Sequence, residues 1–525
     1  MSFNIQQSTF NSQQPTVNTS TVNTSTVKIT RSVSRIHFEQ FQDPRSSRFY
    51  LTGLVTIAFL ILFAFSSLQL WLFREGNDLA FFDQLVYLLS QGESPVSTLL
   101  EGVHLIGDHG AIILYPISLL YVIYPDVHWL LAVQAIAFAL GVVPIYGLSR
   151  DSDLSVNYAR AIAVCYVLYP GIFNINFYAE FRPETIAVPA LIWAVWAAKN
   201  RSIGQYAIAI ILVLSCKEAL ALTVIGLGLW LSLCQKRLWY GLGTMAAGGA
   251  WFIFAALYLI PTFRGGHQMA GTWHYESLGT SLSEIALKVL TNPQILLSRA
   301  LMSDRLFYYL LLISPILIGL HWRKILTIIP ALPMLGLNIL ADFPRQRDLI
   351  HQYALPIIPF LFVWLIASLV YLTRHRQRRW LSPRMLILWS TVAWLALAKY
   401  GYYWTRYAPL YSNVSAVNGA LELVDDHARV LTSGYVAPHL SQRSMITLLG
   451  DDNNVERITK YDIDTVLIAK QHLGFSITPE AAEQTIKNLS ESQGFELIYQ
   501  QQDVFLWQKT SSMFKIDSRH SHLSV

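Results

Sequence analysis

Charged residues are scarce in this sequence. Only 14% of its 525 residues are Asp, Glu, Lys or Arg, and 53% are hydrophobic. Soluble domains carry roughly 25% charged residues, so the composition indicates an integral membrane protein. The net charge of +5 is no argument for nucleic-acid binding, because Lys and Arg in membrane proteins mainly report orientation.

Cysteine is scarce too. Cys165, Cys216 and Cys234 all lie in apolar runs, without Cys-X-X-Cys or Cys/His ligand spacing, so we expect no disulfide framework. A cleavable signal peptide is also not expected, because the first apolar segment begins near Tyr50, is long and lacks a small-residue cleavage site. That segment should remain as a membrane anchor.

Apolar runs of nearly 20 residues recur from position 50 to about 404, and each can cross roughly 30 Å of hydrocarbon. We predict an all-α polytopic membrane domain over 49–404, preceded by a disordered cytoplasmic tail at 1–48. Residues 110–124 are apolar but short, and we expect an interfacial or re-entrant helix there. The eleven predicted spans are 50–73, 129–149, 158–178, 184–198, 203–216, 218–234, 238–260, 306–320, 325–341, 353–373 and 384–404.

The basic connections set the orientation. With the N-terminus inside, the clusters at 150–160, 199–201, 235–237, 321–324 and 374–379 all become cytoplasmic, as the positive-inside rule requires. Counting 110–124 as a span would place most of them outside. We therefore predict a multi-pass protein of the plasma (inner) membrane whose C-terminal part is external or periplasmic.

Residues 405–525 change in character. Strand-like stretches at 428–434, 445–450, 465–470 and 495–508 surround a helical pattern at 478–492, with Thr478 at its N-cap and Pro479 at its first position. We predict a small external α/β domain. It lacks a Gly-rich phosphate loop, which favours a docking or substrate-shaping role.

Ionisable residues on the predicted external side are the functional candidates, because charges beside a membrane are costly unless they are paired. Asp78 and Asp83 follow the first span on a predicted interfacial helix. A carboxylate there could take a proton from an acceptor hydroxyl. A solvated interfacial carboxylate is the alternative.

The stretch "HLIGDHGAII" at 104–113 holds Asp108 and His109 among glycines that predict a surface loop rather than a regular helix. The pair could bind a divalent metal, contact a phosphate-bearing ligand or relay a proton. Further along, Glu180, Arg182 and Glu184 lie together at the junction of two spans, where Glu184 would also suit a helix N-terminus.

Two clusters offer cations. Lys217 and Glu218 interrupt an apolar run, either as a neutralising pair or with Lys217 bound to a phosphate or diphosphate. Arg345, Arg347 and His351 precede a span on the external side, against the positive-inside trend. A lipid phosphate would satisfy these cations, and so would neighbouring aspartates.

At these motifs the sequence resembles a family of prokaryotic membrane proteins, domain of unknown function 2079. The resemblance covers about residues 50–470. It is carried, in order, by "FFDQLVYLL", "HLIGDH", "FRPETIAVPALIWAVWA", "CKEALALTVIGLGLWL", "HQYALPIIPFLF" and "VLTSGYVAPHLSQR". The sequence departs from the family at Arg182, where His is frequent, and at Gly110 and Ala111, where aromatic residues and Pro are frequent.

That family in turn resembles the GT-C superfamily of membrane glycosyltransferases, which take sugars from polyprenyl-phosphate carriers. The resemblance implies that Asp83 or Asp78 is the acidic residue of the first external loop, and that Glu180 or Glu184 belongs to the second acidic site. It places Asp108 and His109 at a polar motif before the interfacial helix, and Lys217 near the lipid phosphate.

The leading hypothesis is an inverting glycosyltransferase that uses a polyprenyl-phosphate-linked sugar and an acceptor of unknown identity. Mg or Mn is a candidate cofactor, with Asp108, His109 and Glu180 as candidate ligands. Membrane lipid is the other expected partner, and nucleic acid is not one. A transporter or lipid flippase is one alternative, and a non-catalytic membrane scaffold is another.

Overall fold

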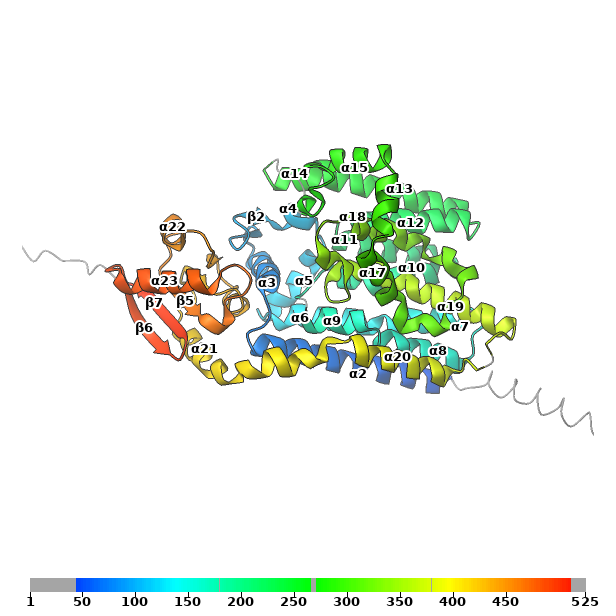
Figure 1. Ribbon diagram of the computed structural model, residues 1–525, viewed down its shortest axis with the longest axis horizontal. Helices are drawn as coiled ribbons and strands as arrows, with labels where there is room; N and C mark the ends of the chain where they lie inside the picture. The colour runs from blue at the N-terminus through cyan, green and yellow to red at the C-terminus, as the bar shows by residue number, and fades with distance from the viewer. Residues whose placement is uncertain (1–43, 179, 266–270, 379, 511–525) are drawn as a thin grey trace, which may run out of the picture. The chain divides into compact units, whose positions relative to one another are not determined.

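The computed structural model describes residues 44–178, 180–265, 271–378 and 380–510 of the chain. The described part is mostly helical, as predicted, and most of its strands form one C-terminal sheet (Figure 1). Residues 1–43 of the predicted tail lie outside the described part.

The α-helices up to residue 263 are α2 (Pro44–Trp71), α3 (Asn77–Ser90), α4 (Leu105–His109), α5 (Leu114–Ile123), α6 (His128–Leu140), α7 (Val142–Arg150), α8 (Val156–Val167), α9 (Pro170–Tyr178), α10 (Glu184–Lys199), α11 (Ile203–Cys216), α12 (Leu220–Leu233), α13 (Leu238–Phe254) and α14 (Ile260–Phe263). A π-helical turn, η1 (Ala255–Leu259), joins the last two. A short antiparallel pair, β1 (Val96–Ser97) and β2 (Val103–His104), lies between α3 and α4.

The later α-helices are α15 (Leu282–Thr291), α16 (Gln294–Ala300), α17 (Ser303–Ile313), α18 (Leu332–Leu340), α19 (Ile358–Arg374), α20 (Pro383–Leu397), α21 (Val414–Leu421), α22 (Asn454–Lys460) and α23 (Pro479–Glu491). Shorter 3-10 and π segments are η2 (Thr272–Tyr275), η3 (Ser314–Gly319), η4 (Trp322–Ala331), η5 (Pro344–Arg347), η6 (Gln352–Ala354), η7 (Lys399–Gly401), η8 (Tyr403–Tyr407), η9 (Ala408–Asn413), η10 (Ala437–His439) and η11 (Lys470–His472).

Helices lie over all eleven predicted spans, but their lengths differ. Within the described residues, five helices are long and apolar enough to cross a membrane, or six if the bent pair 294–300 and 303–319 makes one span. Four further apolar helices have 10–17 residues, among them α5 in the segment predicted to be interfacial. The count of eleven therefore stays a prediction.

Proline explains two of the breaks inside long helices. Proline has no N–H to donate to the carbonyl four residues earlier. The Leu140 carbonyl therefore cannot accept the usual helical hydrogen bond from residue 144, which is proline. Helix α6 ends at Leu140, and α7 begins at Val142. Pro170 acts in the same way on Tyr166, next to the end of α8. The apolar runs continue through both breaks.

The predicted cytoplasmic connections contact one another at one end of the helices. Arg237 donates a hydrogen bond to the Lys199 carbonyl (3.0 Å), Arg374 pairs with Asp153 (2.6 Å), and Arg378 donates to a carbonyl of η3. The predicted external connections contact one another too, as described below. We call their side the polar end.

The C-terminal residues form a five-stranded mixed sheet with strand order β4-β3-β5-β7-β6. Its strands are β3 (Val430–Thr432), β4 (Ile446–Leu448), β5 (Thr465–Ala469), β6 (Phe495–Gln501) and β7 (Val504–Lys509). β4, β3 and β5 are parallel, whereas β7 runs antiparallel to both β5 and β6. Helix α23 begins where the sequence predicts it, with the Thr478 hydroxyl accepting from Ala481 N–H.

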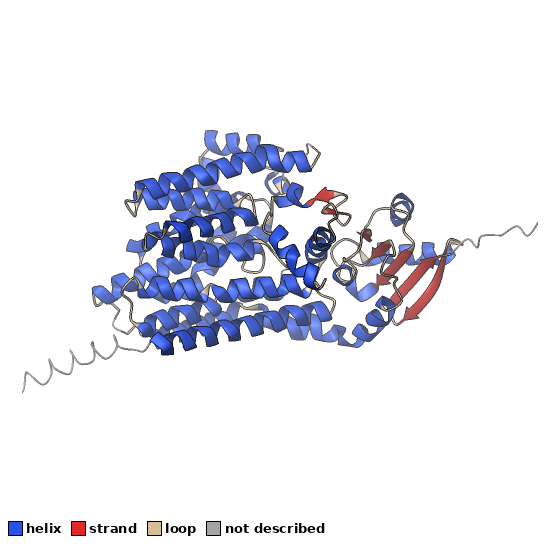
Figure 2. Cartoon of the chain, turned by 180° about the vertical axis from the view of Figure 1, so that it is seen from behind, coloured by secondary structure: helices blue, strands red, loops and turns tan. Residues whose placement is uncertain are grey.

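The sheet lies beside α3 at the polar end of the helices (Figure 2). The loops that follow β3 and β5 contact the end of α2: His439 donates to the Leu70 carbonyl (3.0 Å), and His472 donates to the Phe73 carbonyl (3.1 Å). Burial lowers the pKa of both histidines to about 4, so they are neutral. One apolar cluster runs from Phe73 to β3 and β5, and the α/β part therefore packs directly on the membrane helices.

Candidate active site

A carboxylate from a distant connection caps helix α3. The N-cap residue Gly76 makes no side-chain cap. Glu180, between α9 and α10, instead accepts hydrogen bonds from the backbone N–H groups of Asp78 and Leu79, the latter at 3.0 Å. A Cβ at Gly76 would collide with this carboxylate. Glu180 thus satisfies two unpaired N–H groups and suits the helix dipole.

Asp78 forms an ion pair with Arg182 beside this cap. The Asp78 side chain is 40% exposed and that of Arg182 is 19% exposed. Burial alone would lower the pKa of Arg182, but the charges of Asp78 and Glu180 outweigh it and raise that pKa. Burial and the neighbouring Asp78 carboxylate raise the pKa of Glu180 to about 7.

Lys217 stands between α11 and α12 and reaches the first residue of α10. Its Nζ lies 2.8 Å from Glu184 Oε1, and both side chains are at most 17% exposed. Burial would lower the pKa of Lys217, but the Glu184 and Glu218 carboxylates outweigh it, so the pKa is raised and the side chain is charged. Lys217 therefore pairs with Glu184, whereas the sequence suggests a pair with its neighbour Glu218.

The stretch 105–109 forms helix α4, where its glycines predict a loop. Gly107 allows α4 to lie against the Phe263 carbonyl, which a Cβ would approach to 2.6 Å. Gly110 ends the helix in the left-handed region, at φ +59°, a conformation that glycine adopts readily. Both glycines therefore serve the helix rather than break it.

Helix α4 brings His109 to the start of α12. His109 Nδ1 lies 3.6 Å from Glu218 Oε2, and neither buried atom has a hydrogen-bond partner. His109 Nε2 lies 3.7 Å from Asp108, which in turn lies 3.9 Å from Arg264. Burial would lower the pKa of His109, but the Asp108 and Glu218 carboxylates outweigh it, and the pKa is raised.

The three candidate metal ligands do not assemble. Asp108 and His109 are adjacent, but Glu180 faces the backbone of α3. Within the described residues, no three His, Cys, Asp or Glu side chains are placed to hold a metal ion. The predicted donor set therefore does not fit Mg or Mn.

Residues 271–285, here called the roof segment, cover this group of charges. The His274 ring stacks on Phe343 (centroids 4.9 Å apart) and its Nδ1 lies 3.0 Å from Gln346 Nε2. Burial, with the charges of Lys217 and His109, lowers the pKa of His274 to about 4, so the ring is neutral.

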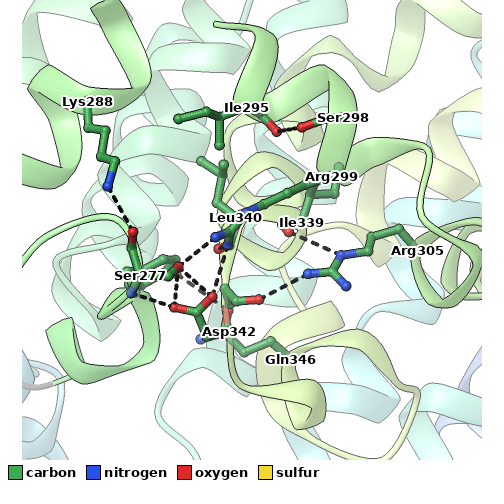
Figure 3. A network of polar contacts seen from close by, with 12 residues as sticks. Ser277, Lys288, Ile295, Ser298, Arg299, Arg305, Ile339, Leu340, Asp342 and Gln346 are labelled. Atoms are coloured by element: carbon green, nitrogen blue, oxygen red, sulfur yellow. Dashed lines mark hydrogen bonds and ion pairs between the residues drawn. The ribbon is translucent and has the colours of Figure 1, made fainter. Parts of the chain in front are cut away.

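Asp342 fastens the roof segment. Its carboxylate accepts from the N–H and hydroxyl of Ser277 (3.0 and 2.7 Å) and lies 3.2 Å from Arg299. Figure 3 shows these three side chains converging, with Lys288 donating to the Ser277 carbonyl (2.9 Å). The roof segment is thus held in place by Asp342, after α18, and by Lys288 and Arg299 on the helices that follow it.

The charges and the roof segment enclose a cavity of about 680 Å³. Its other walls are apolar and come from membrane helices, among them Leu222 of α12, Phe252 of α13 and Leu337 of α18. Nine of the twelve predicted site residues line it: Asp78, Asp108, His109, Arg182, Glu184, Lys217, Glu218, Arg345 and His351. Segments far apart in the sequence therefore share one cavity with a charged side and an apolar side.

The other three predicted residues do not line this cavity. Glu180 caps α3, and Arg347 points toward Asp304 (3.1 Å) and the Asn338 and Ala341 carbonyls. Asp83 is fully buried, and its carboxylate accepts three hydrogen bonds: from the Tyr121 hydroxyl (2.5 Å), the Ser441 hydroxyl (2.6 Å) and the Gln442 amide (3.3 Å).

Some lining residues carry no signal in the sequence analysis. His274 and Gln346 lie in long polar connections and are brought to the cavity only by the fold. Asn338 is a buried amide inside the apolar helix α18, and a polar residue in such a run could have indicated it. Glu75 is 1% exposed beside Glu180, and burial raises its pKa well above the usual value.

Comparison with known proteins gives a family and a fold. A family profile described as "Predicted membrane protein (DUF2079)" matches residues 69–506. No curated protein matches the sequence.

Among solved structures, ArnT from Cupriavidus metallidurans bound to undecaprenyl phosphate is similar, with a TM-score of 0.51 and 10% identity over 88% of this chain and 98% of that one. The apo oligosaccharyltransferase of Archaeoglobus fulgidus gives a TM-score of 0.41, with 12% identity over 88% of this chain and 75% of that one. The likeness to ArnT shows that the two proteins share a fold.

Proposed function

The chain belongs to the DUF2079 family of predicted membrane proteins, and from that premise we propose that it is a membrane glycosyltransferase. In this proposal a sugar is transferred from a polyprenyl-phosphate donor to an acceptor on the external face. The shared fold supports it, since the similar ArnT structure is bound to undecaprenyl phosphate.

One observation carries the proposal: the cavity of about 680 Å³ combines four carboxylates, several cations and an apolar wall made by membrane helices. An isoprenoid chain can lie along Leu222 and Leu337 while its phosphate meets the charged side. A cavity of this size is in the range that holds small ligands.

Asp78 is the carboxylate that we assign as general base. Its side chain is 40% exposed and lines the cavity, and Arg182 serves as its counter-ion. The acceptor hydroxyl gives its proton to Asp78 while the hydroxyl oxygen forms a bond to the anomeric carbon. At the same time the bond from that carbon to the phosphate oxygen breaks, and the electron pair leaves with the phosphate. A single displacement of this kind inverts the anomeric centre.

Asp83, the other candidate base, is less suited to this role. It is 0% exposed, and three side-chain donors already occupy its carboxylate. A general base must come within hydrogen-bond reach of the proton that it takes. We therefore assign Asp83 to the junction between α3 and the C-terminal part.

Cations on the other side of the cavity can stabilise the leaving phosphate. Arg345 is exposed and lies over the rings of Phe343 and Phe475 (5.7 and 5.6 Å). Lys217 is bound to Glu184 and can act as a second, less mobile charge. His351 lines the same cavity and is held by Asp348 (2.7 Å).

The orientation and any metal remain proposals. We propose a cytoplasmic N-terminus and an external or periplasmic polar end. Cysteine labelling at positions 78, 109 and 217 in sealed vesicles tests this, since labelling from the cytoplasmic side would reverse the topology. Mg and Mn are tested by adding each to the metal-free protein.

Transfer from labelled polyprenyl-phosphate sugars to a panel of acceptors tests the function directly. Asp78→Asn keeps the size of the side chain but cannot accept the proton, so transfer should fall about 10²–10⁴-fold. Asp83→Asn is the matched control and should stay active. Failure of every donor, combined with movement of the same lipids across proteoliposomes, would favour a transporter or flippase.

A further inference from the structure

A second cavity, of about 300 Å³, lies where the C-terminal sheet meets helix α3. The sheet contributes the residues at the end of β4, from Thr447 to Gly450, together with Ser476. The membrane part contributes residues 77, 78 and 81 of α3 and residues 99–101. The α/β part therefore forms one wall of a cavity that reaches the proposed base.

Asp78 borders both cavities. Asp78, Phe81 and Leu100 line the larger cavity and the second cavity alike. A group bound in either cavity therefore lies next to Asp78. A donor and an acceptor that share one general base need such an arrangement.

Side chains that line the second cavity indicate the ligand's chemistry. Asn77 and Ser476 both line it, and an amide and a hydroxyl can each donate and accept hydrogen bonds. Groups of this kind suit a ligand that carries hydroxyl groups.

The charges disfavour an anionic ligand. The Arg457 guanidinium is held by both oxygens of Asp452 (2.8 and 2.7 Å), and Asp78 is paired with Arg182. Glu101, which is exposed, adds a negative charge to the lining. Apolar walls from Phe81 and Leu449 complete the cavity.

We propose that the second cavity is the acceptor subsite of this enzyme, and that the acceptor is an uncharged carbohydrate or similar polyol. The inference rests on the proposed glycosyltransferase function and assigns the C-terminal part a share in it. Asn77 and Ser476 bind acceptor hydroxyls, and one hydroxyl reaches Asp78.

Protection from labelling tests the subsite without any transfer. Glu101→Cys introduces a reactive thiol on the wall of the second cavity, and Glu93→Cys, at an exposed residue that does not line it, is the matched control. Cys234→Ser removes the least buried native cysteine. Probes are neutral mono- and disaccharides and, separately, sugar phosphates.

Neutral sugars should slow labelling of Glu101→Cys in a saturable manner, and leave Glu93→Cys unaffected. Protection by sugar phosphates alone, or by neither probe set, would overturn the proposal. Binding of labelled undecaprenyl phosphate is measured on the same samples. Lipid binding without sugar protection refutes only the acceptor subsite, whereas a lack of lipid binding counts against the glycosyltransferase itself.

A second variant connects the subsite to turnover. Ser476→Leu should raise the acceptor KM about tenfold, as expected for a lost hydrogen bond in a filled subsite, while the donor KM stays unchanged. Ser490→Leu, on the exposed face of α23, is the control. An equal rise in both KM values would instead indicate a general disturbance and contradict the assignment.

Discussion

Ionisation of Asp83 should weaken the folded protein. Burial raises the pKa of Asp83 from 3.8 to about 6, although its bonds from Ser441, Tyr121 and Gln442 act in the opposite direction. Between these two pH values the folded chain keeps a proton that the unfolded chain has lost. Stability therefore falls as the pH rises through this window, and the full cost is present above about pH 6.

The magnitude follows from the size of the shift. About two pKa units, at about 1.4 kcal/mol each, give a cost of about 3 kcal/mol at neutral pH relative to pH 4. Asp83→Asn removes the titration and keeps one oxygen, which accepts from either the Tyr121 or the Ser441 hydroxyl, since these donate to different oxygens of the carboxylate. The new amide N–H can donate to the other hydroxyl oxygen. The variant should therefore gain stability relative to the wild type as the pH rises.

Denaturant unfolding in detergent, followed by tryptophan fluorescence between pH 4 and 8, measures this difference. Asp153→Asn, at a carboxylate that is 76% exposed, is the control for removing a carboxylate from the surface. A constant difference for Asp83→Asn would refute the titration of this buried carboxyl. Loss of transfer in a stable Asp83→Asn protein would refute our assignment of the base to Asp78.

Three further outcomes are expected. Asp78→Asn should bind undecaprenyl phosphate as tightly as the wild type, while its rate of transfer falls. Equilibrium binding and the transfer assay, measured on the same samples, test this. A loss of lipid binding would contradict the role of Asp78 as the base. Gly76→Ala should lower the free energy of unfolding by roughly 1–3 kcal/mol, because its Cβ collides with the Glu180 carboxylate. Gly53→Ala on α2 is the control for the unfolding measurement, since a Cβ at that position meets nothing within 4 Å. Lys217→Met should lower the free energy of unfolding by about 3–5 kcal/mol, because Glu184 stays buried without its cation. Adding Glu184→Gln should restore part of this stability. If the double variant is no more stable than Lys217→Met alone, the two side chains are not coupled.

The sequence predicts elements well where the signal is local. Helices α11 and α12 end within two residues of the predicted bounds, because Lys217 and Glu218 are the only charges in a long apolar run. The start of α23 is predicted from Thr478 and Pro479 alone. Helix α4 is missed, because Gly107 and Gly110 serve packing and the end of the helix, whereas glycines without context predict a loop.

The direction of a side chain is harder to predict than its neighbourhood. Asp78 and Asp83 lie five residues apart on α3, which separates them by about 140° around the helix. Which of them faces the cavity depends on Ser441 and Gln442, more than 350 positions away. Arg345 and Arg347 diverge for the same reason, since two residues along a 3-10 turn point to different sides.

The hydrogen-bond partners of Asp83 also determine when its surroundings can form during synthesis of the chain. Ser441 follows Asp83 by 358 positions, and at about 5–20 residues per second a ribosome needs roughly 20–70 s to reach it. Until then the Asp83 carboxylate on α3 lacks the hydrogen-bond donors of Ser441 and Gln442. The membrane helices can therefore be inserted long before the polar end of the molecule is complete, and the cavities there take their final form only when almost all of the chain has been made.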